Sequence, residues 1–148
     1  MFKRILVAVD GSQTSEQALR EAARLAGSLQ AQLRIVHVMD NVNLNLGMEF
    51  PNPTEIWDAL SKAGQDILAK AAALAGEAGV PAETCLLEID SLGQRIPEMI
   101  AAEADAWPAD LIVIGTHGRR GLSHLLLGSI AEGVARVATK PVLLIRGT

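Results

Sequence analysis

A glycine-rich segment near the end of the chain carries the residues best suited to hold a ligand. It runs from Gly115 to Ser129, with Gly118 and Gly121 inside it and Gly128 directly before the serine. Glycines let the backbone turn sharply and bring N–H groups against a ligand, and a helix N-terminus adds partial positive charge. The segment therefore predicts a phosphate site. Alternatively, the glycines only shape a turn and Ser129 only caps a helix, but a turn needs one or two glycines and this segment has four.

This segment matches neither of the two common phosphate loops. No glycine in it is followed by Lys-Ser or Lys-Thr, which excludes a P-loop. A dinucleotide fingerprint would follow the first strand, where the chain has only Asp10-Gly11-Ser12. Arg119 offers a possible phosphate contact, whereas we interpret His117 and Arg120 as solvated loop charges.

The elements that must position this segment follow from hydrophobic patterning. Apolar runs alternate with helical patterns along the whole chain, and the expected strands cover 5–9, 32–39, 82–89, 111–114 and 142–145. Strict alternation of five strands and four helices predicts an α/β fold, an open five-stranded parallel sheet with helices on both faces, in a Rossmann-like arrangement. Ligands of such sheets bind outside the carboxyl ends of the strands, where the strand order reverses.

Local signals predict where the helices begin and end. Thr14 followed by Gln17 forms a capping box for the first helix. Pro53 suits the first position of the second helix, which Gly79 and Pro81 end. The third helix carries a proline in its first turn, and the fourth follows the glycine segment.

Composition favours an ordinary globular protein. The chain has 148 residues, 49% of them hydrophobic, with a net charge of −4, so a nucleic-acid partner is not expected. Its length fits a single domain over 1–148. We find no signal peptide and no apolar run near the ~20 residues of a membrane span, so we expect a cytoplasmic protein that does not contact membranes. The single Cys85 is expected to be a small strand hydrophobe.

The glycine spacing resembles a known signature. Gly115 and Gly118 are separated by two residues, nine more residues follow, and then comes Gly128-Ser129, as in the ATP-binding signature of the universal stress protein family. The resemblance extends over the chain, since 5–12 looks like the family's first strand and 141–146 like its last. It implies the family's adenine nucleotide alpha hydrolase-like version of the fold.

The resemblance also implies roles for individual residues. Asp10 would lie beside the ribose and the phosphates or their Mg²⁺ ion. The remaining contacts would come from three sets: backbone at Ala8, Val9 and Val38 beside the adenine; Ile114 and Gly115 flanking the nucleoside; and Gly118, Gly128, Ser129, Ile130 and Ala131 at the phosphates. A carboxylate at the end of a buried strand would be tolerable beside a sugar hydroxyl or a magnesium ion. Alternatively, Asp10 caps the helix that follows it.

The last expected strand suggests how two copies of the chain could associate. An apolar edge strand from Val142 to Ile145 invites pairing, and the resemblance implies a homodimer joined through it. The leading hypothesis is a dimeric ATP-binding protein that couples nucleotide occupancy to stress signalling through an unknown protein partner, with at most slow ATP hydrolysis. The alternatives are a true ATPase or nucleotidyl transferase and a nucleotide-free dimeric scaffold. Preference among ATP, AMP and a cyclic nucleotide stays open.

Overall fold

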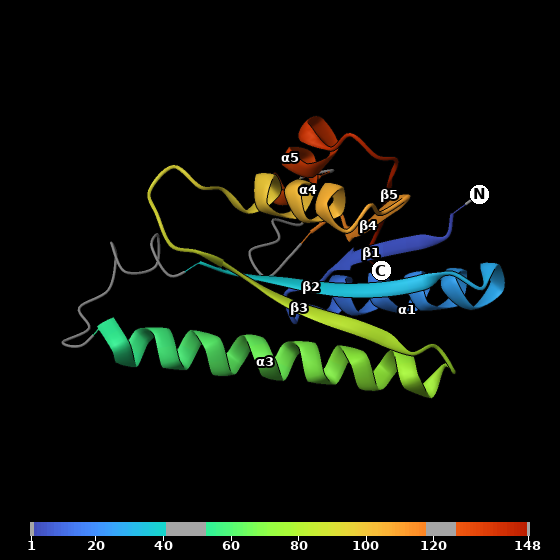
Figure 1. Ribbon diagram of the computed structural model, residues 1–148, viewed down its shortest axis with the longest axis horizontal. Helices are drawn as coiled ribbons and strands as arrows, with labels where there is room; N and C mark the ends of the chain where they lie inside the picture. The colour runs from blue at the N-terminus through green and yellow to red at the C-terminus, as the bar shows by residue number, and fades with distance from the viewer. Residues whose placement is uncertain (1, 41–52, 118–126, 148) are drawn as a thin grey trace.

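The computed structural model describes residues 2–40, 53–117 and 127–147, which form alternating strands and helices (Figure 1). In chain order these elements are β1 (Arg4–Ala8), α1 (Gln13–Leu29), β2 (Gln32–Asp40), α3 (Pro53–Glu77), β3 (Ala82–Ile89), α4 (Ile96–Ala106), β4 (Leu111–Gly115), α5 (Ser129–Val137) and β5 (Val142–Ile145). All five predicted strands are present, and none of their ends shifts by more than one residue.

The strands form one parallel sheet in the order β3-β2-β1-β4-β5. β1 lies at its centre, paired with β2 from Arg4 opposite Gln32 and with β4 from Ile5 opposite Leu111. The chain builds the sheet outward from β1 in one direction and then returns to build it in the other. This arrangement confirms the predicted α/β fold, and it places the reversal of strand order between β1 and β4.

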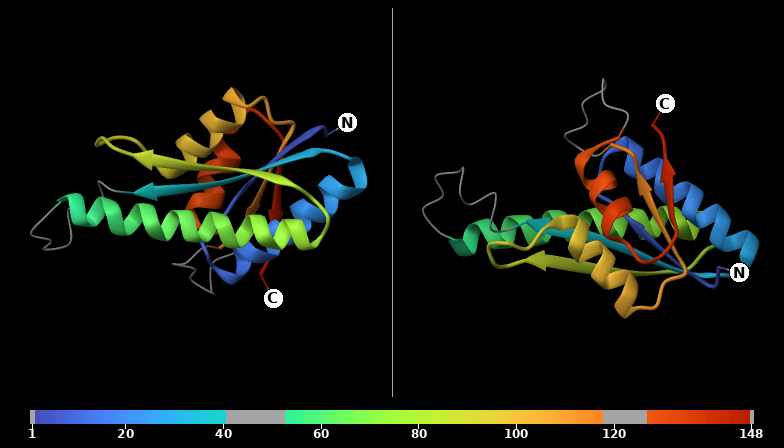
Figure 2. Two further views of the ribbon diagram at one scale, coloured as in Figure 1. Left: turned by 60° about the horizontal axis from the view of Figure 1, so that its bottom comes forward. Right: turned by 90° about the horizontal axis from the view of Figure 1, so that it is seen from above.

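Helices cover both faces of the sheet. One apolar core lies under α1 and α3 and contains Ile5, Val7 and Ile35, and the other lies under α4 and α5 and contains Leu6 and Ile112. The alternation of Ile5, Leu6 and Val7 between the two cores follows from the period of a strand, and Figure 2 shows the helices on opposite sides. In the part of the chain that the structure describes, no helix is long and apolar enough to cross a membrane.

The helix boundaries correct one prediction and confirm another. α1 begins at Gln13 with Ser12 as its N-cap, whose Oγ accepts a hydrogen bond from Ser15 N at 3.2 Å. The predicted capping box at Thr14 is therefore wrong, because the serine two residues earlier has the extended backbone that an N-cap needs. α3 ends as predicted, since Gly79 follows it in the left-handed region with a φ of 81°.

An ion-pair network fastens α4 to the sheet. Arg34 on β2 donates from Nη1 to Glu103 of α4 at 2.6 Å and from Nη2 to Glu83 of β3 at 3.0 Å, and its guanidinium lies 4.9 Å from the Trp107 ring centre. Burial disfavours this charge, but the two carboxylates outweigh burial and raise the pKa of Arg34. The nearby Cys85 thiol has its pKa raised, first by burial and then by Glu103. A raised pKa disfavours the thiolate, so Cys85 suits the predicted packing role and not that of a nucleophile.

Asp110 joins the beginnings of the two central strands. Its Oδ2 accepts hydrogen bonds from the backbone N–H groups of Lys3 at 2.8 Å and Arg4 at 3.0 Å, while its own N–H donates to Arg4 O at 2.7 Å. The two hydrogen bonds to the carboxylate hold the pKa of Asp110 below its usual range, and the bond from Lys3 has the larger effect. Because the ionised form makes these bonds best, the contribution of Asp110 to stability depends on pH.

We predict that Asp110→Asn destabilises the protein at pH 6 and that the difference from wild type shrinks on acidification. The stabilisation from a lowered pKa is complete above the unfolded value of about 3.9 and is lost as the pH falls through the folded value. Urea unfolding between pH 6 and pH 3 measures the difference. Asp58→Asn, which removes an exposed carboxylate from α3, controls for the change in net charge. A difference that stays constant over this pH range would contradict the assignment.

Candidate functional site

The candidate site lies at the carboxyl ends of β1 and β4, where the strand order reverses. β1 leads into Asp10, β4 leads into Thr116, and the N-terminus of α5 returns to the same edge. Gly128 N donates to Thr116 O at 2.6 Å, and Thr116 N donates to Ile145 O at 2.9 Å. These two bonds fix the beginning of α5 beside the ends of β4 and β5.

The N-terminus of α5 has no side-chain cap. Its N-cap is Gly128, which makes no side-chain hydrogen bond, whereas α1 is capped by the Ser12 hydroxyl. The amides of the first turn of a helix have no partner within the helix and together carry partial positive charge. Ser129 is exposed at the first position of α5, and Ala131 is buried below it. An anion is therefore suited to this helix end.

Asp10 is half-buried and held by the loop that follows β1. Its Oδ1 accepts from Ser12 N at 2.9 Å, and its backbone N–H donates to Ser15 Oγ at 3.2 Å. Asp10 is not the cap of α1, which is Ser12, but it stabilises the turn that carries the cap. Among the described residues, no three His, Cys, Asp or Glu side chains group as a metal site. Magnesium in proteins is commonly held by one or two carboxylates plus substrate phosphates, and Asp10 fits that pattern better than a protein cage.

The residues predicted around the nucleotide divide between the two faces of the sheet. Ala8, Ile114 and Ala131 belong to the core under α4 and α5, with Val38 and Ile130 packed against it, whereas Val9 belongs to the core under α1 and α3. The backbone of Val9 already makes two hydrogen bonds: its N–H donates to Val36 O at 2.9 Å, and its carbonyl accepts from His37 Nδ1 at 2.8 Å. The structure thus brings most of the predicted nucleotide contacts together at the carboxyl ends of the strands. The backbone N–H and carbonyl of Val9, however, are already hydrogen-bonded to β2.

Two of the predicted glycines have packing reasons of their own. A Cβ on Gly115 would lie 2.7 Å from Thr14 Cγ2 of α1, and a Cβ on Gly128 would lie 2.8 Å from Thr116 O. Both positions therefore need glycine for contacts within the protein, whether or not a ligand binds. The predicted phosphate residues Gly118 and Arg119 lie outside the described residues.

Sequence reasoning missed the buried polar residues that shape this edge. Ser15 and Thr116 are 6% and 4% exposed, and Ser15 Oγ also donates to Ser12 O at 3.2 Å. Ser12 and Ser15 are three residues apart, which is the spacing of an N-cap and the third residue of its helix. This spacing is the sequence signal that could have identified Ser15. Behind this loop, between α1 and α3, a cavity of about 250 Å³ is lined by residues that include Val9 and Ser12.

Comparisons with known proteins agree with this geometry. A model of the universal stress protein family matches residues 1–146. The chain is 37% identical over 153 residues to the universal stress protein YxiE of Bacillus subtilis, covering 99% of this chain and all of that protein. The fold is similar to the universal stress protein from Archaeoglobus fulgidus in complex with dAMP, with a TM-score of 0.73, 28% identity, and coverage of 97% and 98%. It is also similar to a universal stress protein in complex with cAMP, with a TM-score of 0.74, 25% identity and 99% coverage of both chains.

We predict that Gly128→Ala destabilises the protein by about 1–3 kcal/mol in the absence of any ligand, because its Cβ would overlap Thr116 O. Gly76→Ala is the matched control, since a Cβ there meets nothing within 4 Å on α3 and should stabilise the helix by up to about 1 kcal/mol. Urea unfolding without nucleotide measures both variants. A Gly128→Ala protein as stable as wild type would show that the backbone relaxes around the new methyl group.

Proposed function

The chain belongs to the universal stress protein family, and on that premise we propose that it binds ATP with Mg²⁺ at the carboxyl ends of β1 and β4. The adenine would lie near Ala8, Val38 and Ile114, and the phosphates would lie over the beginning of α5 at Gly128, Ser129, Ile130 and Ala131. The protein is proposed to act as a single-domain cytoplasmic dimer whose nucleotide occupancy changes its binding to a signalling partner.

The observation that supports this proposal most is the beginning of α5. This helix end has no side-chain cap, and a 2.6 Å hydrogen bond from Gly128 N to Thr116 O holds it at the point where strand order reverses. Doubly wound sheets bind ligands at that point, and a helix N-terminus stabilises phosphate through its unpaired amides and its dipole. The topology of the sheet and the local chemistry therefore favour the same place.

The solved relatives favour an adenine nucleotide as the ligand class. Two similar universal stress proteins have structures with dAMP and cAMP, so a nucleotide site is a property of relatives with this fold. Those ligands carry one phosphate, whereas the uncapped α5 and Asp10 offer further contacts to a longer phosphate chain and its metal. We therefore propose ATP over AMP or a cyclic nucleotide.

Asp10 is proposed to contact the magnesium ion or the ribose. Its carboxylate is held by Ser12 N at 2.9 Å, which orients it without neutralising it. Bound magnesium would reduce the repulsion between this carboxylate and the phosphates. Efficient hydrolysis also requires a residue that orients the attacking water. We assign Asp10 to the metal and the ribose and not to this role, so we propose slow hydrolysis at most.

We predict that calorimetry will detect MgATP binding and that Asp10→Asn will weaken it about tenfold or more, because a charged contact is worth about 1.5–3 kcal/mol. Asparagine keeps an oxygen that can accept from Ser12 N, so the loop should stay folded. Asp90→Asn removes an exposed carboxylate that directly follows the carboxyl end of β3, and it should leave the affinity for MgATP unchanged. AMP or cAMP binding as tightly as MgATP would contradict the placement of the phosphates, and an unaffected Asp10→Asn variant would contradict the metal role.

The proposed dimer interface is β5. This strand is at one edge of the sheet, and Leu143 on it is 39% exposed. The other edge strand, β3, carries the polar residues Glu83, Thr84 and Glu88 and is joined to α3 by a 2.6 Å hydrogen bond from Trp57 to Glu88. Pairing of two β5 strands would satisfy the backbone groups of this apolar edge.

We predict that the wild-type chain sediments as a dimer and that Leu143→Glu shifts it toward the monomer, because the new charges would face an apolar strand edge. Leu92→Glu changes a leucine that is 74% exposed in the loop after β3 and should leave the dimer intact. Sedimentation equilibrium with a circular dichroism check of folding measures both variants. A wild-type monomer, or a Leu143→Glu dimer of unchanged stability, would rule out this interface.

A further inference from the structure

His37 on β2 holds the short segment that leads from β1 into Asp10. Its Nδ1 lies 2.8 Å from the carbonyl oxygen of Val9, 28 residues away in the sequence. A carbonyl oxygen can only accept a hydrogen bond, so Nδ1 carries the proton of this bond, in the neutral ring or in the imidazolium. The imidazole is therefore a directed donor to one backbone atom beside the carboxyl end of the central strand.

The peptide group between Val9 and Asp10 is held on both sides. Its carbonyl accepts from His37, and its N–H, which belongs to Asp10, donates to Ser15 Oγ at 3.2 Å. Ser15 is buried, and its own hydroxyl donates to Ser12 O. A peptide group is planar and its C=O and N–H point in opposite directions, so these two bonds fix the orientation of the whole plane. They thereby fix the direction in which the chain enters Asp10.

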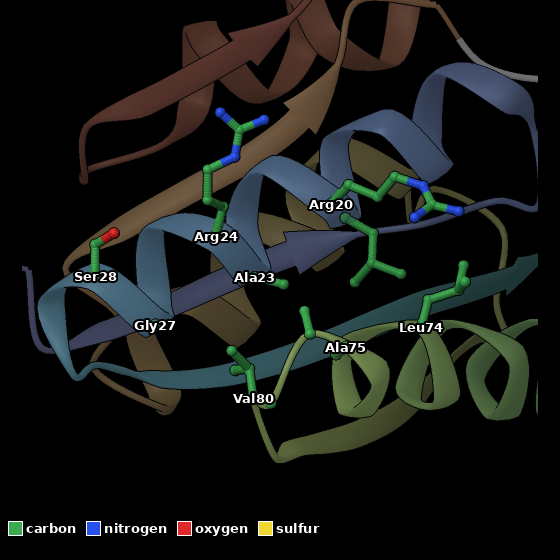
Figure 3. Close-up of a pocket in the computed structure, with 11 residues that line it drawn as sticks. Arg20, Ala23, Arg24, Gly27, Ser28, Leu74, Ala75 and Val80 are labelled. Carbon is green, nitrogen blue, oxygen red and sulfur yellow. The ribbon is translucent and has the colours of Figure 1, made fainter.

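The His37 ring lies on the face of the sheet that α1 and α3 cover. Figure 3 shows these two helices side by side, with Ala23 of α1 and Ala75 of α3 between them. Nearer the ring, α3 has Gly64, where an added Cβ would lie only 3.0 Å from His37 Cδ2. Val38, the next residue of β2, packs against the core under α4 and α5. Because neighbouring side chains of a strand point to opposite faces, His37 and the proposed adenine contact Val38 are on opposite sides of the sheet.

We propose that His37 is a positioning residue for the nucleotide site, which acts through the peptide between Val9 and Asp10 on the Asp10 carboxylate. This inference rests on the proposed function, in which Asp10 contacts the Mg²⁺ ion or the ribose. Ser12 N orients the carboxylate itself at 2.9 Å, and the His37 bond fixes the backbone from which that carboxylate extends. Interactions between charges depend on distance, so a backbone that pivots at this peptide weakens the contact.

Two substitutions of His37 separate the donated bond from the bulk of the ring. His37→Asn keeps an N–H group bonded to Cγ, where Nδ1 is attached, whereas His37→Gln moves this group one carbon further from the backbone. We expect calorimetry with MgATP to show about fivefold weaker binding for His37→Gln, the loss of about one hydrogen bond, and most of the wild-type affinity for His37→Asn. Ile35→Val changes the buried core two residues earlier on the same strand, so it controls for loosened packing and should leave affinity unchanged.

Two further measurements distinguish positioning of Asp10 from a general loss of stability. In the Asp10→Asn background, His37→Gln should weaken MgATP binding much less than it does in the wild type, because the contact through which His37 acts is already reduced. In the protein without nucleotide, hydrogen exchange of the Asp10 amide should be faster in His37→Gln than in His37→Asn, because the peptide is no longer held from its carbonyl side.

Three results would overturn the role of His37, once circular dichroism shows that the variants are folded. The first is a His37→Gln protein that binds MgATP as tightly as the wild type, or a His37→Asn protein that is weakened just as much. The second is an undiminished effect of His37→Gln in the Asp10→Asn background. The third is unchanged exchange of the Asp10 amide. A wild-type chain that does not bind MgATP would refute the proposed function, and the amide exchange would then decide by itself whether His37 positions this backbone.

Discussion

The rest of the structure depends on the burial of the central strand. Ile5, Leu6 and Val7 of β1 are fully buried, with β2 and β4 paired in parallel on its two sides. A strand with no exposed face requires helices on both sides of the sheet. Because its two neighbours are reached by connections that leave in opposite directions, a crevice forms at its carboxyl end. The candidate site is thus a consequence of how the core is buried.

Close backbone contacts at that crevice explain two of its glycines. Gly115 packs against Thr14, and Gly128 approaches Thr116 so closely that neither position has room for a side chain. The same contact that excludes a Cβ also leaves α5 without a side-chain cap, because glycine has no group to supply one. A helix end that lacks such a cap is suited to accept its partner from a ligand. Packing therefore requires glycine here, and the proposed phosphate site would favour the same residue type.

The polar contacts at the amino ends of the strands differ from those at the carboxyl ends. At the amino ends, Asp110 ties the starts of β1 and β4 together, and Arg34 fastens α4 to β2 and β3. Both side chains bond to groups that belong to other elements of the fold. At the carboxyl ends, Asp10 and the N-terminus of α5 are charged or dipolar groups beside a crevice.

The sequence determined the fold class and the five strands, because the strand and helix periods are local and alternate along the whole chain. It also predicted a candidate site at the carboxyl ends of the strands. It also indicated the glycine positions, but it could not distinguish a glycine needed for packing from one needed for a ligand, since that depends on Thr14 and Thr116 approaching from elsewhere in the chain. The cap at Ser12 was missed because two local patterns competed, and the backbone conformation decided between them. Only the tertiary structure joined Arg34 to Glu103 and His37 to Val9, because residues distant in sequence meet only when the sheet and its helices assemble.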